Sequence, residues 1–293
     1  MVQMRLMSAR VRVLSTLVVL AAGLLAVLWW MDAQPLLAWN LPRRAAPPML
    51  IIAHRGDTER FPEDTAEAIW SAANMGADGI EFDVHQSADG TWWVIHDATV
   101  DRTTNGSGAV RDLTDEVLAR LQIDGGTGFP TDASDGIGLS KLSTILDGLS
   151  DYEGRLYIDL QHAVRADPTD LARQLSGWPA TVICRSLDDA QMVSAASTSV
   201  STMIRADRIG VDPPVDSLLL EAYGQATISA VASIDLPVAT YIDGRFASRA
   251  EDAVLRRAWA AGVDAFLTKD LAAALALRQE LRQGGSSSVL AIR

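Results

Sequence analysis

The sequence predicts an α/β fold of the (β/α)₈ TIM-barrel class. From about position 49 onward, short apolar runs alternate with segments of helical length, and repeated strand–helix units favour a parallel sheet. Eight such runs occupy about 235 residues, which is close to the typical size of this barrel. Polar side chains also gather where the first predicted strands end, at the barrel face that carries active sites.

The individual elements follow from apolar periodicity and turn signals. The eight predicted strands are 49–54, 78–84, 91–97, 156–161, 181–186, 201–206, 237–242 and 264–269. The helices predicted between them are 62–75, 169–175, 187–196, 217–233 and 249–261. The third strand follows the second through the Asp89-Gly90 turn, which is typical of a hairpin-like link. A longer segment at about 98–154 separates the third strand from the fourth.

Composition excludes several classes of protein. The chain of 293 residues has 25 Lys and Arg against 37 Asp and Glu, a net charge of −12, whereas a nucleic-acid binder needs a basic surface. The single cysteine, Cys184, excludes a disulfide within the chain and a cysteine-rich zinc site. With only four histidines, a metal site depends on carboxylates, which favours Ca²⁺ or Mg²⁺.

The N-terminal fifty residues form a separate part of the chain. An uncharged run at 13–31 follows Arg5, Arg10 and Arg12, and as a helix it is about 28 Å long, near the hydrocarbon thickness of a bilayer. We therefore expect a single-pass anchor in the cell membrane with the folded domain on the extracytoplasmic side. A cleaved secretory signal is the alternative, and it also exports the rest of the chain. The predicted organisation is a basic cytoplasmic N-terminus at 1–12, a transmembrane anchor at 13–31, a linker at 32–48, a folded domain at 49–283 and a flexible tail at 284–293.

Acidic residues occupy two neighbouring strands. Glu81 and Asp83 are two positions apart, so both point to the same side of their strand, and the apolar residues between and beside them are expected to face the helices. Asp159 lies on the fourth strand, and Glu63 in the first loop can add a further oxygen ligand. Inward-facing acids need a partner, so we expect a divalent metal here rather than a solvated rim or pairs with arginines.

Two histidines follow different strands beside these acids. His54 and His96 are placed to approach one centre from two sides, where one imidazole can accept a proton and the other can donate one. Arg55 suits a phosphate because its planar guanidinium matches two phosphate oxygens, and a salt bridge to the acids is the alternative. His85 and His162 are expected to be peripheral.

Five motifs follow one another through the first half of the folded domain. They are His54-Arg55-Gly56, Pro62-Glu63-x-Thr65, Glu81-x-Asp83, His96-Asp97 and Asp101-Arg102-Thr103-Thr104-Asn105-Gly106. In this order they resemble the glycerophosphodiester phosphodiesterase family, strongly up to about position 146 and weakly after 157. The resemblance implies a TIM barrel with an insertion after the third strand. It also implies metal-dependent hydrolysis of glycerophosphodiesters, such as glycerophosphocholine, to glycerol 3-phosphate and an alcohol.

The resemblance also implies roles for individual residues. His54 and His96 match the acid/base histidines and Arg55 the phosphate-binding arginine. The metal ligands are matched by Glu81, Asp83 and Asp159, with Glu63 close to them. This chain departs from the family at Gln161, where the pattern has a lysine that helps to hold the phosphate. Lys269, at the end of the last predicted strand, is expected to replace that charge.

Two other functions are compatible with these residues. A lysophospholipase D that acts on lysolipid head groups would suit a membrane anchor, and it predicts apolar side chains around the site. A non-catalytic relative that binds a phosphate-bearing ligand is suggested by the altered fourth strand. A small-molecule substrate is expected in each case, with no nucleic-acid partner.

Overall fold

The computed structural model describes residues 49–124, 136–161, 167–205, 217–221, 238–241, 256 and 263–284. The chain divides into two units, Met1–Ala45 and Ala46–Arg293, and every described residue belongs to the second. The expected basic N-terminus, membrane anchor and linker at 1–48 therefore lie outside the described residues, as does the tail from 285 onward. Among the helices that are described, none combines the length and the apolar character needed to cross a membrane.

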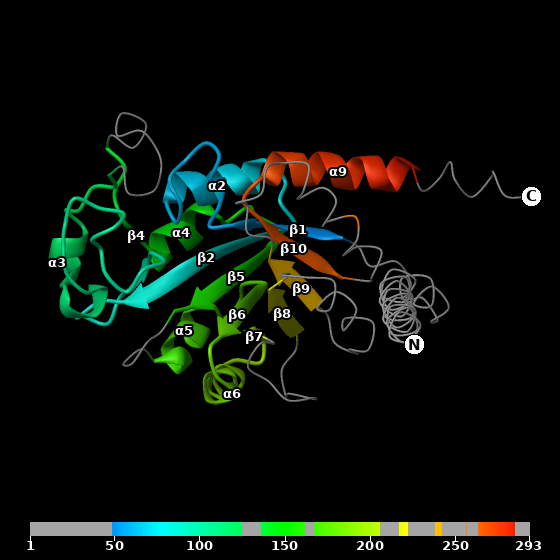
Figure 1. Cartoon of the computed structure of the whole chain (residues 1–293). Helices are drawn as coiled ribbons and strands as arrows, with labels where there is room; N and C mark the ends of the chain where they lie inside the picture. The colour runs from blue at the N-terminus through cyan, green and yellow to red at the C-terminus, as the bar shows by residue number, and fades with distance from the viewer. Residues whose placement is uncertain are drawn as a thin grey trace, which may run out of the picture. The chain divides into compact units, whose positions relative to one another are not determined.

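The described part of the domain is built on parallel strands. Eight of them form one parallel ladder in the order β1-β10-β9-β8-β7-β6-β5-β2, and β1 pairs with β2 as well as with β10 (Figure 1). Their bounds are β1 (Leu50–His54), β2 (Gly79–Gln86), β5 (Arg155–Leu160), β6 (Ala180–Cys184), β7 (Ser201–Arg205), β8 (Ser217–Glu221), β9 (Val238–Tyr241) and β10 (Ala265–Thr268). The arrangement is TIM-barrel-like, which confirms the predicted fold class at this level.

Two predicted elements differ from the structure. The third predicted strand is β3 (Trp92–Val94), which pairs antiparallel with β2 and with β4 (Ser140–Lys141) and lies outside the parallel ladder. A turn as short as Asp89-Gly90 permits a hairpin but no parallel crossover. The ladder instead contains β8, the sixth of its strands in chain order. This strand lies in a segment predicted to be helical, since a short apolar run is compatible with a buried strand as well as with a helix. The insertion thus begins after the second parallel strand and includes β3.

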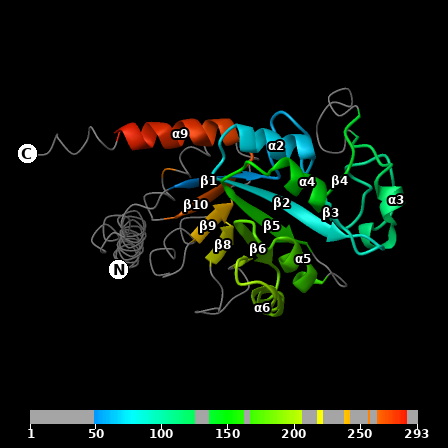
Figure 2. The same cartoon turned by 180° about the vertical axis from the view of Figure 1, so that it is seen from behind.

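Helices cover the outer face of the ladder. They are α2 (Ala66–Asn74), α4 (Leu142–Gly148), α5 (Pro168–Gln174), α6 (Leu187–Ala196) and α9 (Leu271–Gly284). In both views α2 and α9 lie on one side of the strands and α5 and α6 on the other (Figures 1 and 2). Thr65 caps α2, since its side chain accepts a hydrogen bond from the Ala68 N–H. The cap fixes where the first loop ends and α2 begins.

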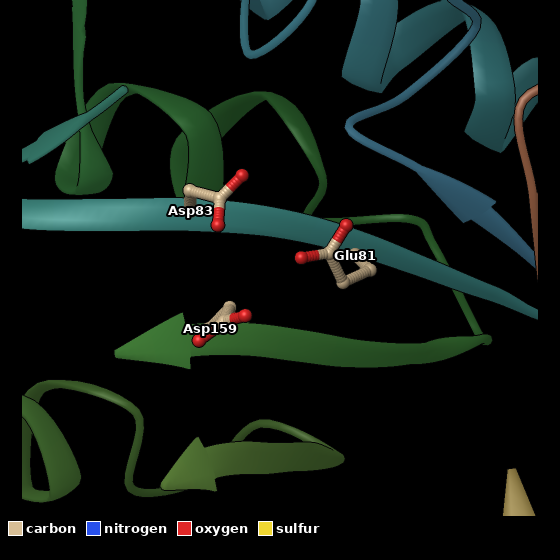
Figure 3. Close-up of side chains that lie close together, drawn as sticks. All are labelled: Glu81, Asp83 and Asp159. Atoms are coloured by element: carbon tan, nitrogen blue, oxygen red, sulfur yellow. The ribbon is translucent and has the colours of Figure 1, made fainter. Parts of the chain in front are cut away.

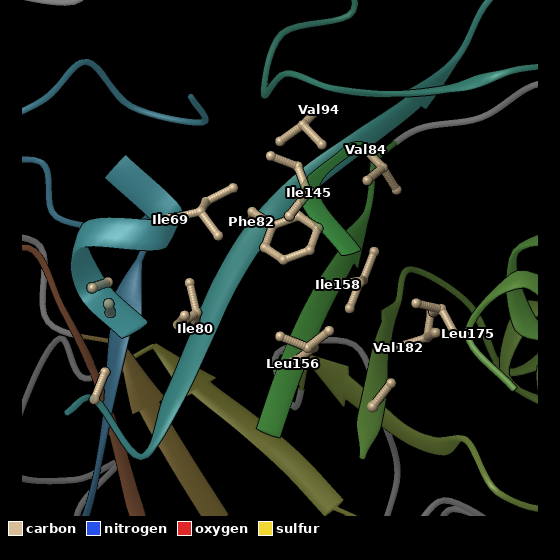
Figure 4. Packing of buried hydrophobic residues seen from close by; sticks show 14 of the residues in the cluster. Ile69, Ile80, Phe82, Val84, Val94, Ile145, Leu156, Ile158, Leu175 and Val182 are labelled. Atoms are coloured by element: carbon tan, nitrogen blue, oxygen red, sulfur yellow. The ribbon is translucent and has the colours of Figure 1, made fainter. Parts of the chain in front are cut away.

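The hydrophobic core shows which face of β2 points toward the helices. Ile80, Phe82 and Val84 are fully buried against helix residues that include Ile69 and Ile145 (Figure 4). Because side chains alternate along a strand, Glu81 and Asp83 must point to the inner side. This confirms the predicted direction of the two acids.

The inner side of the ladder is apolar near the start of the strands. One inner cluster consists of Ile52, Tyr157, Ile183, Met203, Ala265 and Leu267. Gly79 makes room for it, because a Cβ there would lie 2.6 Å from the Tyr157 ring. The inward positions that follow these residues toward the carboxyl ends of the strands are polar, so the fold brings polar side chains together at that end.

The insertion has a small core of its own. Beside β3 and β4 it contains η2 (Val110–Asp112) and α3 (Asp115–Leu118), packed through Trp93, Ile95, Val100, Val110 and Leu118. The Asp115 carboxylate joins the segments, since it accepts hydrogen bonds from Ser87 (2.7 Å), Thr91 (2.6 Å), Trp93 (2.9 Å) and Lys141 (2.8 Å). Burial raises the pKa of Asp115, but these donors, Lys141 first, outweigh it and hold the pKa well below its usual value.

We expect Asp115→Asn to destabilise the domain by about 1–3 kcal/mol at pH 7, because an amide nitrogen cannot accept the hydrogen bonds that the carboxylate accepts. A depressed pKa contributes stability above the unfolded-state pKa and loses it as pH falls. The difference between variant and wild type in urea unfolding should therefore shrink below about pH 4. Asp112→Asn is the control, since its side chain is 67% exposed. An Asp115→Asn effect that is the same at pH 7 and pH 3 would contradict this role.

Candidate active site

Three carboxylates meet on the inner side of the strands. Glu81 and Asp83 come from β2 and Asp159 from β5, where Asp159 is the direct partner of Asp83. One ligand oxygen from each lies within 4.8 Å of the others, and the side chains face one another (Figure 3). All three are buried, with exposed fractions of 2%, 1% and 6%. The predicted convergence of Glu81, Asp83 and Asp159 is confirmed.

The electrostatics of this acid cluster favour a cation. Burial and the charges of Asp83 and Asp159 raise the pKa of Glu81 well above its usual value. Burial and the charge of Asp83 do the same for Asp64, whose Oδ1 accepts a hydrogen bond from the Asp83 N–H. Three converging, buried carboxylates fit a hard divalent cation with oxygen ligands. The residues present therefore suit a metal, and Glu81, Asp83 and Asp159 would hold it.

Glu63 is not one of the three carboxylates that converge in the acid cluster, and its expected role as a further metal ligand stays a prediction. Its Oε1 accepts hydrogen bonds from Arg55 Nη1 at 3.0 Å and from Arg102 Nη2 at 2.6 Å. Burial raises the pKa of Glu63, but the charges of Arg55, Arg102 and Lys269 bring it below its usual value. In the structure this carboxylate thus pairs with two guanidinium groups.

Arg55 reaches over the acid cluster from a tight turn after β1. Its backbone is left-handed, with φ 58°, and the next residue, Gly56, has φ 85°. A Cβ on Gly56 would lie 2.6 Å from the backbone of Ala68, so only glycine fits. The turn directs the Arg55 N–H to Glu81 Oε2 (3.1 Å) and places Nε 3.1 Å from Asp83 Oδ2. The salt bridge to the acids, the alternative considered from the sequence, is thus present in the structure.

The two predicted catalytic histidines approach this region from different segments. His54 ends β1, pairs in register with Glu81, and has Nε2 3.7 Å from Glu81 Oε2. His96 follows Ile95, whose N–H donates to the carbonyl of Asp83 at 3.0 Å. His96 Nδ1 lies 2.6 Å from Asp97 Oδ1. Because Asp97 occupies Nδ1, Nε2 is the ring nitrogen of His96 that can exchange a proton with a substrate.

A chain of ion pairs connects the loops that carry the histidines. Arg102 Nε lies 2.6 Å from Asp97 Oδ2, and Arg102 Nη2 lies 2.6 Å from Glu63, which in turn pairs with Arg55. The hydrogen bond from Arg102, followed by the one with His96, lowers the pKa of Asp97 to about 2 despite partial burial. Both histidines therefore belong to one end of the domain. Arg102 was part of a sequence motif, but its bridging role depends on contacts that spacing does not show.

Lys269 follows β10 at the same end of the strands. Its alternation with Ala265 and Leu267 gives it an inward position, and its charge acts on Glu63. Gln161, which follows β5, donates a hydrogen bond from Nε2 to Asp83 Oδ1. The neutral amide thus contacts the acid cluster without adding positive charge to it.

Sequence reasoning missed two inward residues. His85 was expected to be peripheral, yet it shares the inner face with Glu81 and Asp83, is 6% exposed and donates from Nε2 to the carbonyl of His96 at 3.1 Å. Arg185 lies two positions beyond the inward Ile183, and its Nη2 donates to Asp159 Oδ2 at 3.0 Å. Strand alternation was the available signal for both. His162 lies outside the described residues.

Curated relatives match a part of the chain. A glycerophosphodiester phosphodiesterase from Caldanaerobacter subterraneus is 56% identical over 72 residues, which is 25% of this chain and 30% of that protein. Glycerophosphodiester phosphodiesterase 1 from Bos taurus is 50% identical over 70 residues, which is 24% of this chain and 21% of that protein. The chain thus matches less than a third of the length of these relatives.

Solved structures match over a longer stretch. A glycerophosphodiester phosphodiesterase from Agrobacterium tumefaciens superposes with a TM-score of 0.63 at 28% identity, covering 77% of this chain and 99% of that one. An Oleispira antarctica phosphodiesterase, solved with the product sn-glycerol-3-phosphate, has a TM-score of 0.65 at 16% identity and covers 78% and 96%, which shows a shared fold. The model of the glycerophosphoryl diester phosphodiesterase family matches residues 54–283. This match covers most of the chain and includes the acid cluster and both histidines, so the chain belongs to the glycerophosphoryl diester phosphodiesterase family.

Proposed function

We propose that this protein is a metal-dependent phosphodiesterase that hydrolyses glycerophosphodiesters to glycerol 3-phosphate and an alcohol. The observation that carries the proposal is the buried cluster of Glu81, Asp83 and Asp159, with His54 Nε2 3.7 Å from Glu81 Oε2. His96 lies at the same end of the domain, with its Nδ1 engaged by Asp97. Family membership and the glycerol 3-phosphate bound to the Oleispira antarctica relative support the same substrate class.

The described residues suggest how the reaction is divided among them. A divalent cation, Ca²⁺ or Mg²⁺, would supply charge neutralisation at the phosphate when bound to the acid cluster. Arg55 adds guanidinium donors that match phosphate oxygens. One histidine removes the proton from the attacking hydroxyl, and the other donates a proton to the leaving alkoxide. If the hydroxyl belongs to water, glycerol 3-phosphate forms directly; if it belongs to the substrate's glycerol, the alcohol leaves from a cyclic phosphodiester, which water then opens to glycerol 3-phosphate. The Asp97 carboxylate orients His96 for its part through Nδ1.

The direct test is a substrate panel with the full-length protein and each metal in turn. Release of glycerol 3-phosphate from glycerophosphocholine in the presence of Ca²⁺ or Mg²⁺ is the expected result. Preference for lysophosphatidylcholine over glycerophosphodiesters would favour the lysophospholipase D alternative. Absence of product from every diester, with retained binding of glycerol 3-phosphate, would favour a non-catalytic binder and overturn the proposal.

We also propose that residues 13–31 anchor the protein in the cell membrane with the catalytic domain outside the cytoplasm. The support is the sequence alone, an uncharged run of membrane-spanning length after three arginines. Fractionation and protease treatment of intact spheroplasts test it. Membrane-bound protein that is digested only from outside supports the anchor, and full-length protein in the soluble cytoplasmic fraction contradicts it.

A further inference from the structure

Arg185 carries a largely buried guanidinium beside the acid cluster, and the proposed reaction gives it no role. It follows β6 directly, and its alternation with Ile183 turns the side chain to the inner side of the ladder. The side chain is only 15% exposed. Nothing in the motifs of the first half of the chain points to it.

The hydrogen bonding of Arg185 is incomplete. Its Nη2 donates to Asp159 Oδ2 at 3.0 Å, whereas its Nε is buried and donates to no residue that the structure describes. A guanidinium has five N–H donors in a planar fork. Burying such a group with an unused donor is costly, so a site with this geometry favours an acceptor that arrives from outside the chain.

The strand order places Arg185 opposite Arg55. The ladder runs β1-β2-β5-β6, so the residues that follow β1 and β6 flank the acids carried by β2 and β5. Arg55 pairs with Asp83 on one flank and Arg185 with Asp159 on the other. Gln161 follows β5, which lies between β2 and β6 in the ladder, and its uncharged amide donates a hydrogen bond to Asp83.

Charge balance favours a phosphodiester between these two flanks. The carboxylates of Glu81, Asp83 and Asp159 together with one divalent cation have a net charge of −1. Adding the charge of Arg55 brings this sum to zero. Adding Arg185 gives the site a net charge of +1, which complements the single negative charge of a phosphodiester. A planar fork also matches two phosphate oxygens, as a point charge does not.

On these grounds we propose that Arg185 is a second phosphate-binding residue, which contacts the substrate phosphate from the β6 side while Arg55 contacts it from the β1 side. The inference rests on the proposed function and deepens it, because it assigns to Arg185 the charge that Gln161 does not supply. It makes Arg185, rather than Lys269 alone, the residue that completes phosphate neutralisation.

The test separates phosphate binding from metal binding. Calorimetric titration of the full-length wild type and Arg185→Gln is carried out first with Ca²⁺ or Mg²⁺ alone, and then with sn-glycerol 3-phosphate on metal-saturated protein. We expect Arg185→Gln to weaken glycerol 3-phosphate binding by about 10- to 100-fold, with metal affinity within about threefold of wild type. Arg185→Lys should recover part of the loss, because it restores the charge without the fork.

Kinetics give an independent measurement. For glycerophosphocholine, KM should rise more than kcat falls, since phosphate contacts contribute to binding of the ground state as well as the transition state. Arg120→Gln is the matched control, because Arg120 is 76% exposed and pairs with Glu116 on the insertion. It should leave all these constants unchanged.

Two results would overturn the assignment. Weakened metal binding with unchanged glycerol 3-phosphate binding would show that Arg185 only orients Asp159. Unchanged binding of both in a folded Arg185→Gln protein would show no role at all. Because wild-type turnover is measured in parallel, failure of the proposed function, which leaves the wild type inactive on every diester, is distinct from both results.

Discussion

Replacing His54 or His96 by glutamine is expected to lower kcat for release of glycerol 3-phosphate by about 10²- to 10⁴-fold, because each variant removes a group that transfers a proton in the transition state. His54, at the end of β1, lies beside Glu81 of the acid cluster, and His96, in the loop after β3, lies at the same end of the domain with its Nδ1 engaged by Asp97. Glutamine can keep a hydrogen bond but cannot exchange a proton at neutral pH. Steady-state kinetics with glycerophosphocholine measure the effect.

Measurements of folding and of metal binding distinguish the two histidine variants from proteins that have lost their fold. Both should retain the far-UV circular dichroism of the wild type and should still bind the metal. Gln86→Ala is a suitable control, since Gln86 ends β2 and donates only to the carbonyl of Gly90 in the hairpin turn, and it should leave kcat within about twofold. Histidine variants that turn over within a few-fold of wild type would exclude acid/base catalysis by these residues.

Removal of the divalent metal is expected to abolish hydrolysis and to lower the melting temperature of the protein. A ligand at 100 times its Kd stabilises the folded state by about 2.7 kcal/mol, which for a domain of this size corresponds to a shift in Tm of about 5–10 °C. Glu81→Gln should remove most of this metal-dependent shift, because it deletes one of three converging carboxylates. Thermal unfolding with and without EDTA, followed by addition of Ca²⁺ or Mg²⁺, measures it.

In the metal-free protein, Glu81→Gln should raise the stability of the folded state instead of lowering it. Burial and the neighbouring acids raise the pKa of Glu81. A carboxyl group whose pKa is raised in the folded state destabilises that state once pH exceeds the unfolded-state pKa of about 4.3. Metal-free wild type should therefore lose stability as pH rises from 4 to 8. Glu81→Gln should be the more stable protein at pH 8, while the exposed Glu116→Gln should show neither effect. Equal metal-dependent shifts in wild type and Glu81→Gln would contradict the acid cluster as the metal site.

Alternation along single strands was sufficient to predict part of the site. Ile80, Phe82 and Val84 identify the helix-facing side of β2, and this places Glu81 and Asp83 on the inner side without any knowledge of neighbouring strands. The same rule, applied consistently, would have placed His85 on the inner face and Arg185 beyond Ile183. Both placements follow from consecutive positions of single strands alone.

Other features of the fold and of the site depend on contacts between residues that are far apart in the sequence. A short apolar run such as Leu218-Leu219-Leu220 has no periodicity that distinguishes a strand from a buried helix, so β8 was predicted as helix. The partners of Glu63 come from Arg55, eight positions away, and from Arg102, 39 positions away. No spacing in the first loop shows that two guanidinium groups converge on this carboxylate.

The sequence by itself determined the barrel class and the inward direction of Glu81 and Asp83, because strand alternation and motif order are properties of consecutive positions. Only the tertiary structure decided which strand completes the parallel ladder, that Glu63 pairs with arginines, and that Arg185 flanks Asp159. These depend on the register between β2, β5 and β6 and on loops that meet from distant parts of the chain, and such contacts are selected by the packing of the whole domain.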